Sequence, residues 1–215
     1  LCLDRAGLVG NDGATHHGLI DLAYLRPIPN MSICAPRVAE DLRQAMYMGQ
    51  EMGGPLAIRY PRGRSMHDIH QPQLVYGKGI CLKPGKDMAV LTLGAIGNTM
   101  IEAIQQVEKD KPVSIAHYDM RWLKPLDSEI LYEVAEKFDT IVTVEDGVVD
   151  GGLGSAVLEW LSDNSNVSSL AGSHKVVRLG VKDQFVEHGS TKELYQLLKL
   201  DKEGICESLL QALEK

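Results

Sequence analysis

Two periods of apolar and polar positions alternate along the chain. Short apolar runs predict strands, and longer segments with apolar residues three or four positions apart predict helices. Near the start, a strand over 31–35 is followed by a helix over 38–52 and by a second strand over 55–60, which Pro61 ends. Strand, helix and strand in this order predict a βαβ unit and therefore a parallel sheet.

A second alternation begins after a polar stretch that holds Pro72. We expect residues 1–70 to form one domain, 71–76 a linker and 77–215 a second domain. Within the second domain the pattern predicts strands over 79–82, 88–93, 113–118, 140–144 and 176–179, and helices over 99–109, 128–137, 152–162, 191–197 and 202–214, the last with Asp201 as its N-cap. The prediction is a partial parallel sheet followed by a three-layer α/β/α domain.

Composition narrows the class of protein. Hydrophobic residues make up 44% of the 215, which is enough for a buried core and argues against global disorder. The formal net charge is −7, and no run is basic, so nucleic acid and anionic membrane surfaces are poor candidates for partners. No apolar stretch approaches the roughly 20 residues that a membrane span needs.

The cysteines point to a reducing compartment. Four are spread along the chain without a C-x-x-C pair, which argues against a zinc site and against a disulfide framework. We therefore expect a cytoplasmic protein. The chain opens on Leu1-Cys2-Leu3, an apolar run that is typical of the end of a buried strand, so we also expect it to be part of something longer.

The segment richest in candidate chemistry is R-A-G-L-V-G-N-D-G-A-T-H-H-G, residues 5–18. Its glycines let backbone approach a ligand closely, and Arg5, Asp12 and His16 supply a cation, a carboxylate and an imidazole. The segment follows a strand, where α/β sheets bind ligands. The alternative is a polar surface loop with incidental histidines. A metal site on His16 and His17 is disfavoured, because adjacent side chains rarely reach one ion.

A second candidate is R-Y-P-R-G, residues 59–63, which ends a strand at the same sheet edge. Its two arginines suit an anion such as phosphate, although two solvated surface charges fit equally well. In V-E-D-G-V-V-D-G-G-L-G-S, residues 144–155, glycines precede a helix and could bind an anion, but tight packing between strand and helix is favoured. His67 and His70 lack a third ligand. Trp122 and Trp160 are interpreted as core or interface residues.

Together these segments resemble one family, 1-deoxy-D-xylulose-5-phosphate synthase. The resemblance rests on D-R-A-G-L-V-G-x-D-G-x-T-H-x-G, L-R-x-I-P-N-M, R-Y-P-R-G, Y-G-K-G, D-M-R-W-L-K-P-L-D and V-E-D-G-x-x-x-G-G-L-G-S, which run in the family's order over essentially the whole chain. It implies the end of a pyrimidine-binding domain followed by a transketolase-like C-terminal domain.

The resemblance also implies an activity. The family joins pyruvate to D-glyceraldehyde 3-phosphate with loss of carbon dioxide, using thiamine diphosphate and Mg²⁺, as a homodimer in the non-mevalonate isoprenoid pathway, which also feeds thiamine biosynthesis. By the resemblance, His16 is the catalytic residue, Asp12 contacts a hydroxyl of the acceptor, and Arg5 and Arg62 hold its phosphate. His17 occupies a variable position and receives no role.

The same resemblance implies that part of the machinery lies elsewhere. The family's G-D-G motif for diphosphate and Mg²⁺ does not occur in this sequence, and its catalytic glutamate falls upstream of residue 1. We therefore expect no cofactor or metal ligands here and no activity from this chain alone. One departure from the family is the helix start Arg37-Val38-Ala39-Glu40, which lacks the usual Ser or Thr cap.

Two other functions remain open at this point. One is a different transketolase-type enzyme, such as a transketolase or the β-subunit of an oxo-acid dehydrogenase, which R-Y-P-R-G beside D-R-A-G disfavours. The other is a dimerisation module without catalysis.

Overall fold

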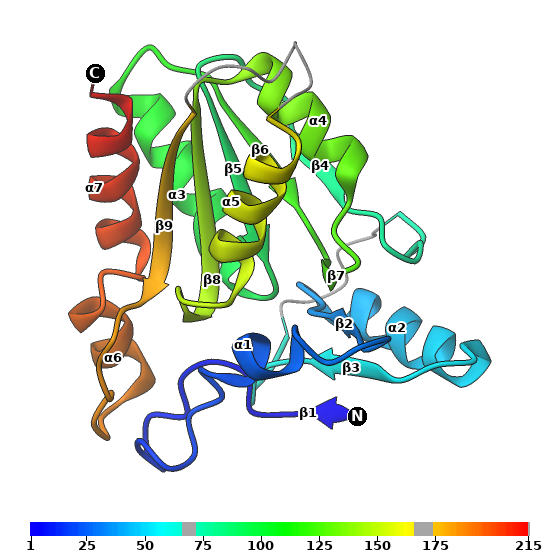
Figure 1. Ribbon diagram of the computed structural model, residues 1–215. Coiled ribbons are helices and arrows are strands. Elements are labelled where there is room, and N and C mark those ends of the chain that lie inside the picture. Colours follow the sequence, from blue (N-terminus) through cyan, green and yellow to red (C-terminus); the bar gives the residue numbers. More distant parts are fainter. Residues whose placement is uncertain (66–71, 166–173, 215) are drawn as a thin grey trace.

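Two β-sheets organise the computed structural model, which describes residues 1–65, 72–165 and 174–214. The smaller sheet lies at the carboxyl ends of the parallel strands of the larger one (Figure 1). His67 and His70, the histidines of the polar stretch, lie outside the described residues.

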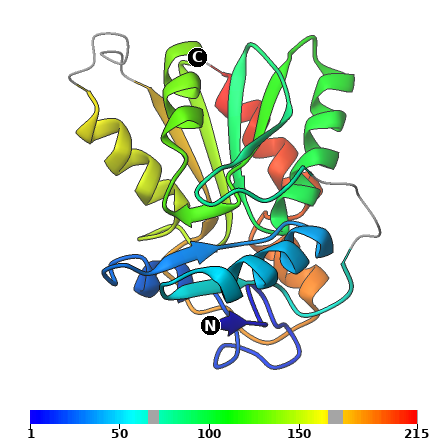
Figure 2. The same cartoon turned by 90° about the vertical axis from the view of Figure 1, so that its right-hand side faces the viewer.

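The smaller sheet has the strand order β1-β3-β2-β7. Strand β1 (Cys2–Leu3) and strand β2 (Ser32–Cys34) both pair in parallel with β3 (Leu56–Arg59), and helix α2 (Ala39–Glu51) connects β2 to β3. The expected βαβ unit is therefore confirmed. Figure 2 shows α2 lying along this small sheet.

The fourth strand of that sheet comes from the second half of the chain. Strand β7 (Trp122–Lys124) comes from the region after residue 77 and pairs antiparallel with β2 through Ile33 and Cys34. The motif D-M-R-W-L-K-P-L-D thus supplies an edge strand to the N-terminal sheet. Trp122 is fully buried there, which confirms the core interpretation.

The larger sheet has the order β4-β6-β5-β8-β9. Only β4 is antiparallel to its neighbour, and the other pairs are parallel. Its strands are β4 (Ile80–Lys83), β5 (Met88–Leu93), β6 (Ile115–Asp119), β8 (Thr140–Val148) and β9 (Lys175–Val181).

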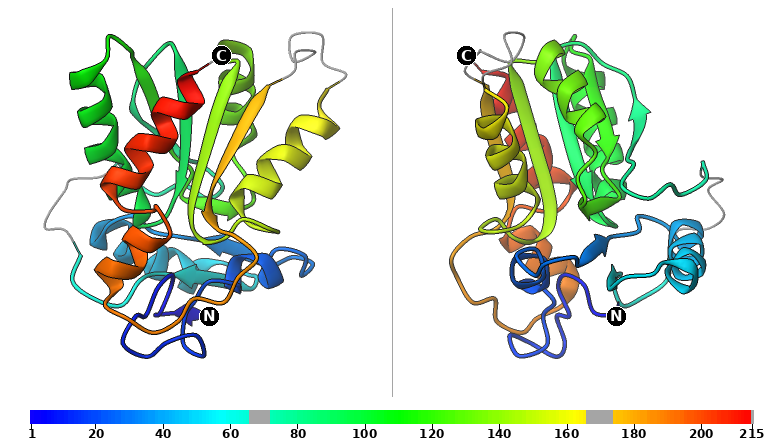
Figure 3. Two further views of the ribbon diagram at one scale, coloured as in Figure 1. Left: turned by 90° about the vertical axis from the view of Figure 1, so that its left-hand side faces the viewer. Right: turned by 45° about the vertical axis from the view of Figure 1, so that its right-hand side comes forward.

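Helices cover both faces of the larger sheet. Helices α3 (Ile96–Asp110) and α7 (Lys202–Leu213) share one apolar cluster, and α4 (Ser128–Lys137) and α5 (Leu153–Asp163) share another. Figure 3 shows the sheet between these two layers, so the three-layer α/β/α prediction is confirmed. Helix α6 (Thr191–Leu197) packs near the end of β9.

Side-chain caps explain why the sequence pattern predicts the start of some helices correctly. Asp127 accepts hydrogen bonds from the first turn of α4, Ser190 forms a capping box with Glu193, and Asp201 accepts from Gly204 as expected. Helix α2 has no capping side chain of its own, but Ser65 Oγ accepts the Ala39 N–H at 2.9 Å. A distant residue thus replaces the missing cap.

Candidate functional site

The loop 5–18 is closed at its base by glycine backbone. Gly7 N–H donates to Gly18 O at 2.8 Å, and Gly18 N–H donates back to Gly7 O at 2.9 Å. Ala6 N–H donates to Tyr60 O at 3.1 Å, which ties the loop to the end of β3. The two segments that the sequence singled out therefore meet at one sheet edge.

Three of the four expected site residues form one cluster. The Asp12 Oδ2 atom accepts from Arg5 Nη1 at 3.0 Å and from Arg62 Nη1 at 3.0 Å. All three side chains remain partly in solvent, with Asp12 31% exposed and Arg62 62% exposed. Two guanidinium groups thus converge on one carboxylate oxygen, and the cluster keeps a net positive charge that suits an added anion.

His16 lies on the same loop, four residues after Asp12. The exposed His16 ring is hydrogen-bonded through Nδ1 to Thr15 Oγ1 at 2.9 Å. The backbone N–H of His16 donates to Gly13 O. No hydrogen bond joins its ring to the arginine cluster among the described residues. The catalytic role of His16 and the binding roles of the cluster stay predictions.

The pairing of Arg59 with Arg62 as an anion site is wrong. Arg59 ends a strand whose residues are all buried, and its Nε donates to both carboxylate oxygens of Asp21, at 2.8 and 2.9 Å. Its Nη2 donates to Gly18 O at 2.8 Å and to Asp146 O. Arg59 therefore holds the base of the loop 5–18 in place from the interior of the protein. The signal that sequence reasoning missed is its position inside a fully buried strand.

The glycine turn before α5 binds a carboxyl group of the chain itself. Glu145 accepts from Leu153 N–H at 2.7 Å and from Gly154 N–H at 3.0 Å. A Cβ on Gly152 would lie 1.8 Å from Glu145 Oε2, so only glycine fits. The packing interpretation of this turn is confirmed, and its helix N-terminus is already occupied by the Glu145 carboxylate.

The Glu145 carboxyl should make stability depend on pH. Burial raises the pKa of Glu145 from 4.5 to about 7, against the two backbone hydrogen bonds that lower it. The unfolded chain therefore loses this proton first as pH rises, so we expect stability to fall between pH 4.5 and about 7, by about 3 kcal/mol. Urea unfolding of Glu145→Gln should lose this component, because glutamine does not titrate. Parallel curves for both proteins would contradict the assignment.

Charged residues also join the two sheets. Arg37 Nε pairs with Asp119 at 3.1 Å, and Arg121 Nη2 pairs with Asp41 at 3.1 Å, with all four side chains buried. Burial is the main cause that raises the pKa of Asp119 to about 6. These pairs assign a structural role to D-M-R-W, which motif spacing alone did not reveal.

Two cavities meet at Arg62. One of about 430 Å³ lies beside the first turns of α3, α6 and α7, and the other, of about 480 Å³, lies beside the start of α2. Both are lined by Pro61, Arg62 and Ala95. An anion held by Arg62 would therefore have open space on either side.

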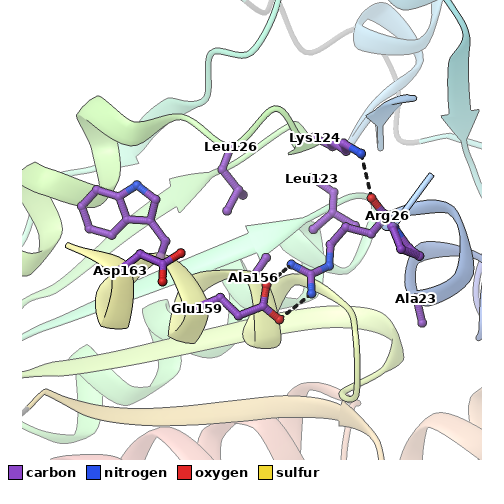
Figure 4. Close-up of a pocket in the computed structure, with 10 residues that line it drawn as sticks. Ala23, Arg26, Leu123, Lys124, Leu126, Ala156, Glu159 and Asp163 are labelled. Atoms are coloured by element: carbon purple, nitrogen blue, oxygen red, sulfur yellow. Dashed lines mark hydrogen bonds and ion pairs between the residues drawn. The ribbon is translucent and has the colours of Figure 1, made fainter. Parts of the chain in front are cut away.

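A larger cavity of about 580 Å³ shares no residue with this cluster. It lies between the end of α1 (Asp21–Leu25), β7 and α5. In Figure 4, Arg26 forms a two-pronged ion pair with Glu159, at 2.6 and 2.7 Å, and Lys124 reaches the Arg26 carbonyl. These contacts clamp α1 to the larger domain, which explains the arginine of L-R-x-I-P-N-M.

Two features of the described residues bear on the cofactor and on membranes. No group of three or more His, Cys, Asp or Glu side chains there could hold a metal ion. Over the same residues, none of the helices combines the length and the apolar character that crossing a bilayer requires.

Comparison with known proteins identifies the class. A family model for the transketolase pyrimidine-binding domain matches residues 1–66, and one for the transketolase C-terminal domain matches residues 77–205. A solved structure described as a split-gene transketolase in an inactive β4 tetramer aligns with 99% of this chain and 65% of its own, at 30% identity and a TM-score of 0.83. The chain belongs to the transketolase family.

Within this family the curated relatives point to one enzyme. The 1-deoxy-D-xylulose-5-phosphate synthase of Parabacteroides distasonis is 54% identical over 213 residues, and that of Bacteroides fragilis is 52% identical over 208. These alignments cover 97% and 95% of this chain but 33% and 31% of the relatives. The chain thus spans about a third of the length of the synthases to which it is similar, which confirms the resemblance seen in its motifs.

Proposed function

We propose that this chain is the C-terminal part of a 1-deoxy-D-xylulose-5-phosphate synthase, a transferase that uses thiamine diphosphate and Mg²⁺. The reaction joins pyruvate to D-glyceraldehyde 3-phosphate and releases carbon dioxide, as the first step of the non-mevalonate isoprenoid pathway. The observation that carries the proposal is the convergence of Arg5 and Arg62 on Asp12 at the end of β3. The identity to named synthases over nearly the whole chain supports it.

The cluster suggests how the phosphate of the acceptor binds. Arg5 and Arg62 present their guanidinium groups to the single oxygen of Asp12. A phosphate dianion offers more charge and more oxygens than a carboxylate, so it replaces Asp12 between the two arginines. The released Asp12 carboxylate then accepts a hydrogen bond from a hydroxyl of the acceptor. Arg5 and Arg62 thus anchor the substrate, and Asp12 orients it.

His16 takes the proton-transfer role. Its ring is exposed on the loop that carries Asp12, and an imidazole can donate or accept a proton near neutral pH. Thiamine diphosphate supplies the carbanion chemistry when it is bound. The described residues offer no metal-ligand group, so no step is assigned to Mg²⁺ in this chain.

The proposal includes the surroundings of the enzyme. We place the protein in the cytoplasm, since its four cysteines are unpaired, as is usual in a reducing compartment. We also propose that the parent enzyme is a homodimer. For the chain on its own we propose a non-catalytic, self-associating state, in line with the description of the split-gene relative as an inactive tetramer.

Replacing Arg62 in the parent synthase tests the phosphate site. Because the Arg62–Asp12 pair is largely exposed, its own contribution is small, and a large effect has to come from the substrate. Arg62→Ala removes a charge-assisted contact worth about 1.5–3 kcal/mol, so the KM for glyceraldehyde 3-phosphate should rise at least about tenfold. The KM for pyruvate, which has no phosphate, should stay close to that of the unmodified enzyme.

Two further variants make this measurement specific. Arg64→Ala is the matched control, because Arg64 is an exposed arginine on the same cavity and should leave both KM values nearly unchanged. His16→Ala should lower kcat instead of raising the KM for one substrate. An unchanged KM for glyceraldehyde 3-phosphate in Arg62→Ala would remove Arg62 from the site.

A further inference from the structure

The loop 5–18 rests on a buried carboxylate of the larger domain. Gly7, in the left-handed region at φ +74°, lies so close to Asp146 that a Cβ there would be 1.9 Å from Oδ2. Asp146 Oδ2 accepts a hydrogen bond from the hydroxyl of Tyr195, on α6, at 2.5 Å. Asp146 Oδ1 is buried and has no hydrogen-bond partner among the described residues. A buried charged acceptor without a partner is costly, so this oxygen calls for a donor.

A donor of the right kind belongs to His17. The Val9 N–H donates to His17 Nδ1 at 2.9 Å, so Nδ1 acts as an acceptor. In a neutral imidazole the proton then lies on Nε2. His17 Nε2 is also buried and also lacks a partner among the described residues. The His17 ring therefore has a donor, Nε2–H, without a hydrogen-bond partner, and the Asp146 carboxylate has an acceptor, Oδ1, without one.

Backbone geometry places the two groups near one another. Gly18, which follows His17, exchanges two hydrogen bonds with Gly7, and Gly7 packs directly against the Asp146 carboxylate. Burial is the main cause that raises the pKa of Asp146, while Arg59 and the Tyr195 hydroxyl act in the opposite direction. The Gly7–Gly18 hydrogen bonds and the packing of Gly7 on Asp146 therefore carry the placement of His17 near this carboxylate.

We propose that His17 is a positioning residue, whose Nε2–H is joined to Asp146 Oδ1 through one buried water. The bond would fasten the loop that carries Asp12 and His16 to β8 and, through Tyr195, to α6. One ring would then hold the loop twice, by accepting from Val9 and by donating through the water to Asp146. Its effect on catalysis rests on the proposed function, but the bond itself does not.

The first test determines the tautomer of the His17 ring by nitrogen-15 NMR of the 215-residue chain. We expect the Nε2–H tautomer, with a slowly exchanging Hε2 proton shifted downfield. In Asp146→Asn that resonance should move upfield, because a neutral amide accepts a weaker hydrogen bond than a carboxylate. The exposed ring of His16 on the same loop is the internal control and should not respond. A proton on Nδ1, or an Hε2 resonance that Asp146→Asn leaves in place, would overturn the proposal.

The second test compares two substitutions of similar size. His17→Gln keeps one acceptor for Val9 and one donor for Asp146, whereas His17→Leu fills the space without either. Exchange of the Val9 amide proton should accelerate about tenfold or more in His17→Leu, and His17→Gln should restore most of the protection. Equal exchange in both variants would contradict the proposal.

Kinetics of the parent synthase then separate this bond from the proposed function. His17→Leu should change kcat and the KM for glyceraldehyde 3-phosphate while leaving the KM for pyruvate unchanged, and His17→Gln should rescue both. If the protein has another function, the response of the Hε2 resonance to Asp146→Asn still reports on the bond, because this measurement requires no activity. If the bond is absent, that response is lost while the synthase assay still succeeds.

Discussion

Residues 1–215 alone should form no deoxyxylulose phosphate from pyruvate and glyceraldehyde 3-phosphate, even with thiamine diphosphate and Mg²⁺ supplied. The family resemblance places the diphosphate motif and the catalytic glutamate outside this chain, which spans about a third of its synthase relatives. A site with anchoring residues but without its cofactor-binding part lacks the group that performs the chemistry. Mass spectrometry of the reaction mixture measures the product directly.

The control is the parent synthase at the same concentration, assayed with the same substrates. A second control adds the remaining part of the parent to the purified chain, since complementary parts can reconstitute a site that neither contains. Product above the protein-free background from the chain alone would contradict the division of the machinery that we propose.

Asp41→Ala should lower the free energy of unfolding by about 3–5 kcal/mol. The Arg121–Asp41 pair is nearly inaccessible, with side chains 1% and 0% exposed, and removal of one partner leaves the other charge buried without its counter-ion. Arg121 also donates to the carbonyls of Pro72 and Gln73, so its guanidinium cannot easily swing out to water. Urea unfolding at pH 7 gives the change.

Two controls separate burial from charge. The double variant Asp41→Leu/Arg121→Met removes both charges and should be less destabilised than Asp41→Ala, because no unpaired charge remains. Arg43→Ala breaks an exposed pair with Glu40 on the same helix and should lower the free energy of unfolding far less than Asp41→Ala does. If Asp41→Ala were as mild as Arg43→Ala, the buried pair would not be what joins the two sheets.

The sequence predicts long elements well and short ones poorly, for a physical reason. The strand over 88–93 and the helices over 128–137 and 191–197 have the predicted bounds. An apolar pattern spans each segment, and a capping side chain directly precedes each of the two helices. Helix α1 and strand β7 were not predicted. Strand β7 is three residues long, and it exists as a strand because β2 pairs with it from a distant part of the chain.

The residues of the candidate site also differ in how well the sequence predicts them. Motif and spacing place Arg5, Asp12 and Arg62 together correctly, since all three follow strands that end at one edge. The inward turn of Arg59 escapes such reasoning, because a charged residue is interpreted as a surface residue unless its buried partner, Asp21, is known. The buried polar atoms of His17 and Asp146 that lack hydrogen-bond partners result from packing between segments far apart in sequence, which no local pattern encodes.

The pairing of β2 with β7 has a consequence for synthesis of the protein. During translation, Ser32–Cys34 emerge from the ribosome long before Trp122–Lys124, and until then one edge of the N-terminal sheet has no neighbour. An open edge can pair with another nascent chain, so this interval exposes the protein to misassembly. The smaller sheet reaches its final form only after Trp122–Lys124 have been synthesised. Pauses in translation between these two strands should therefore lower the yield of folded protein more than pauses after β7.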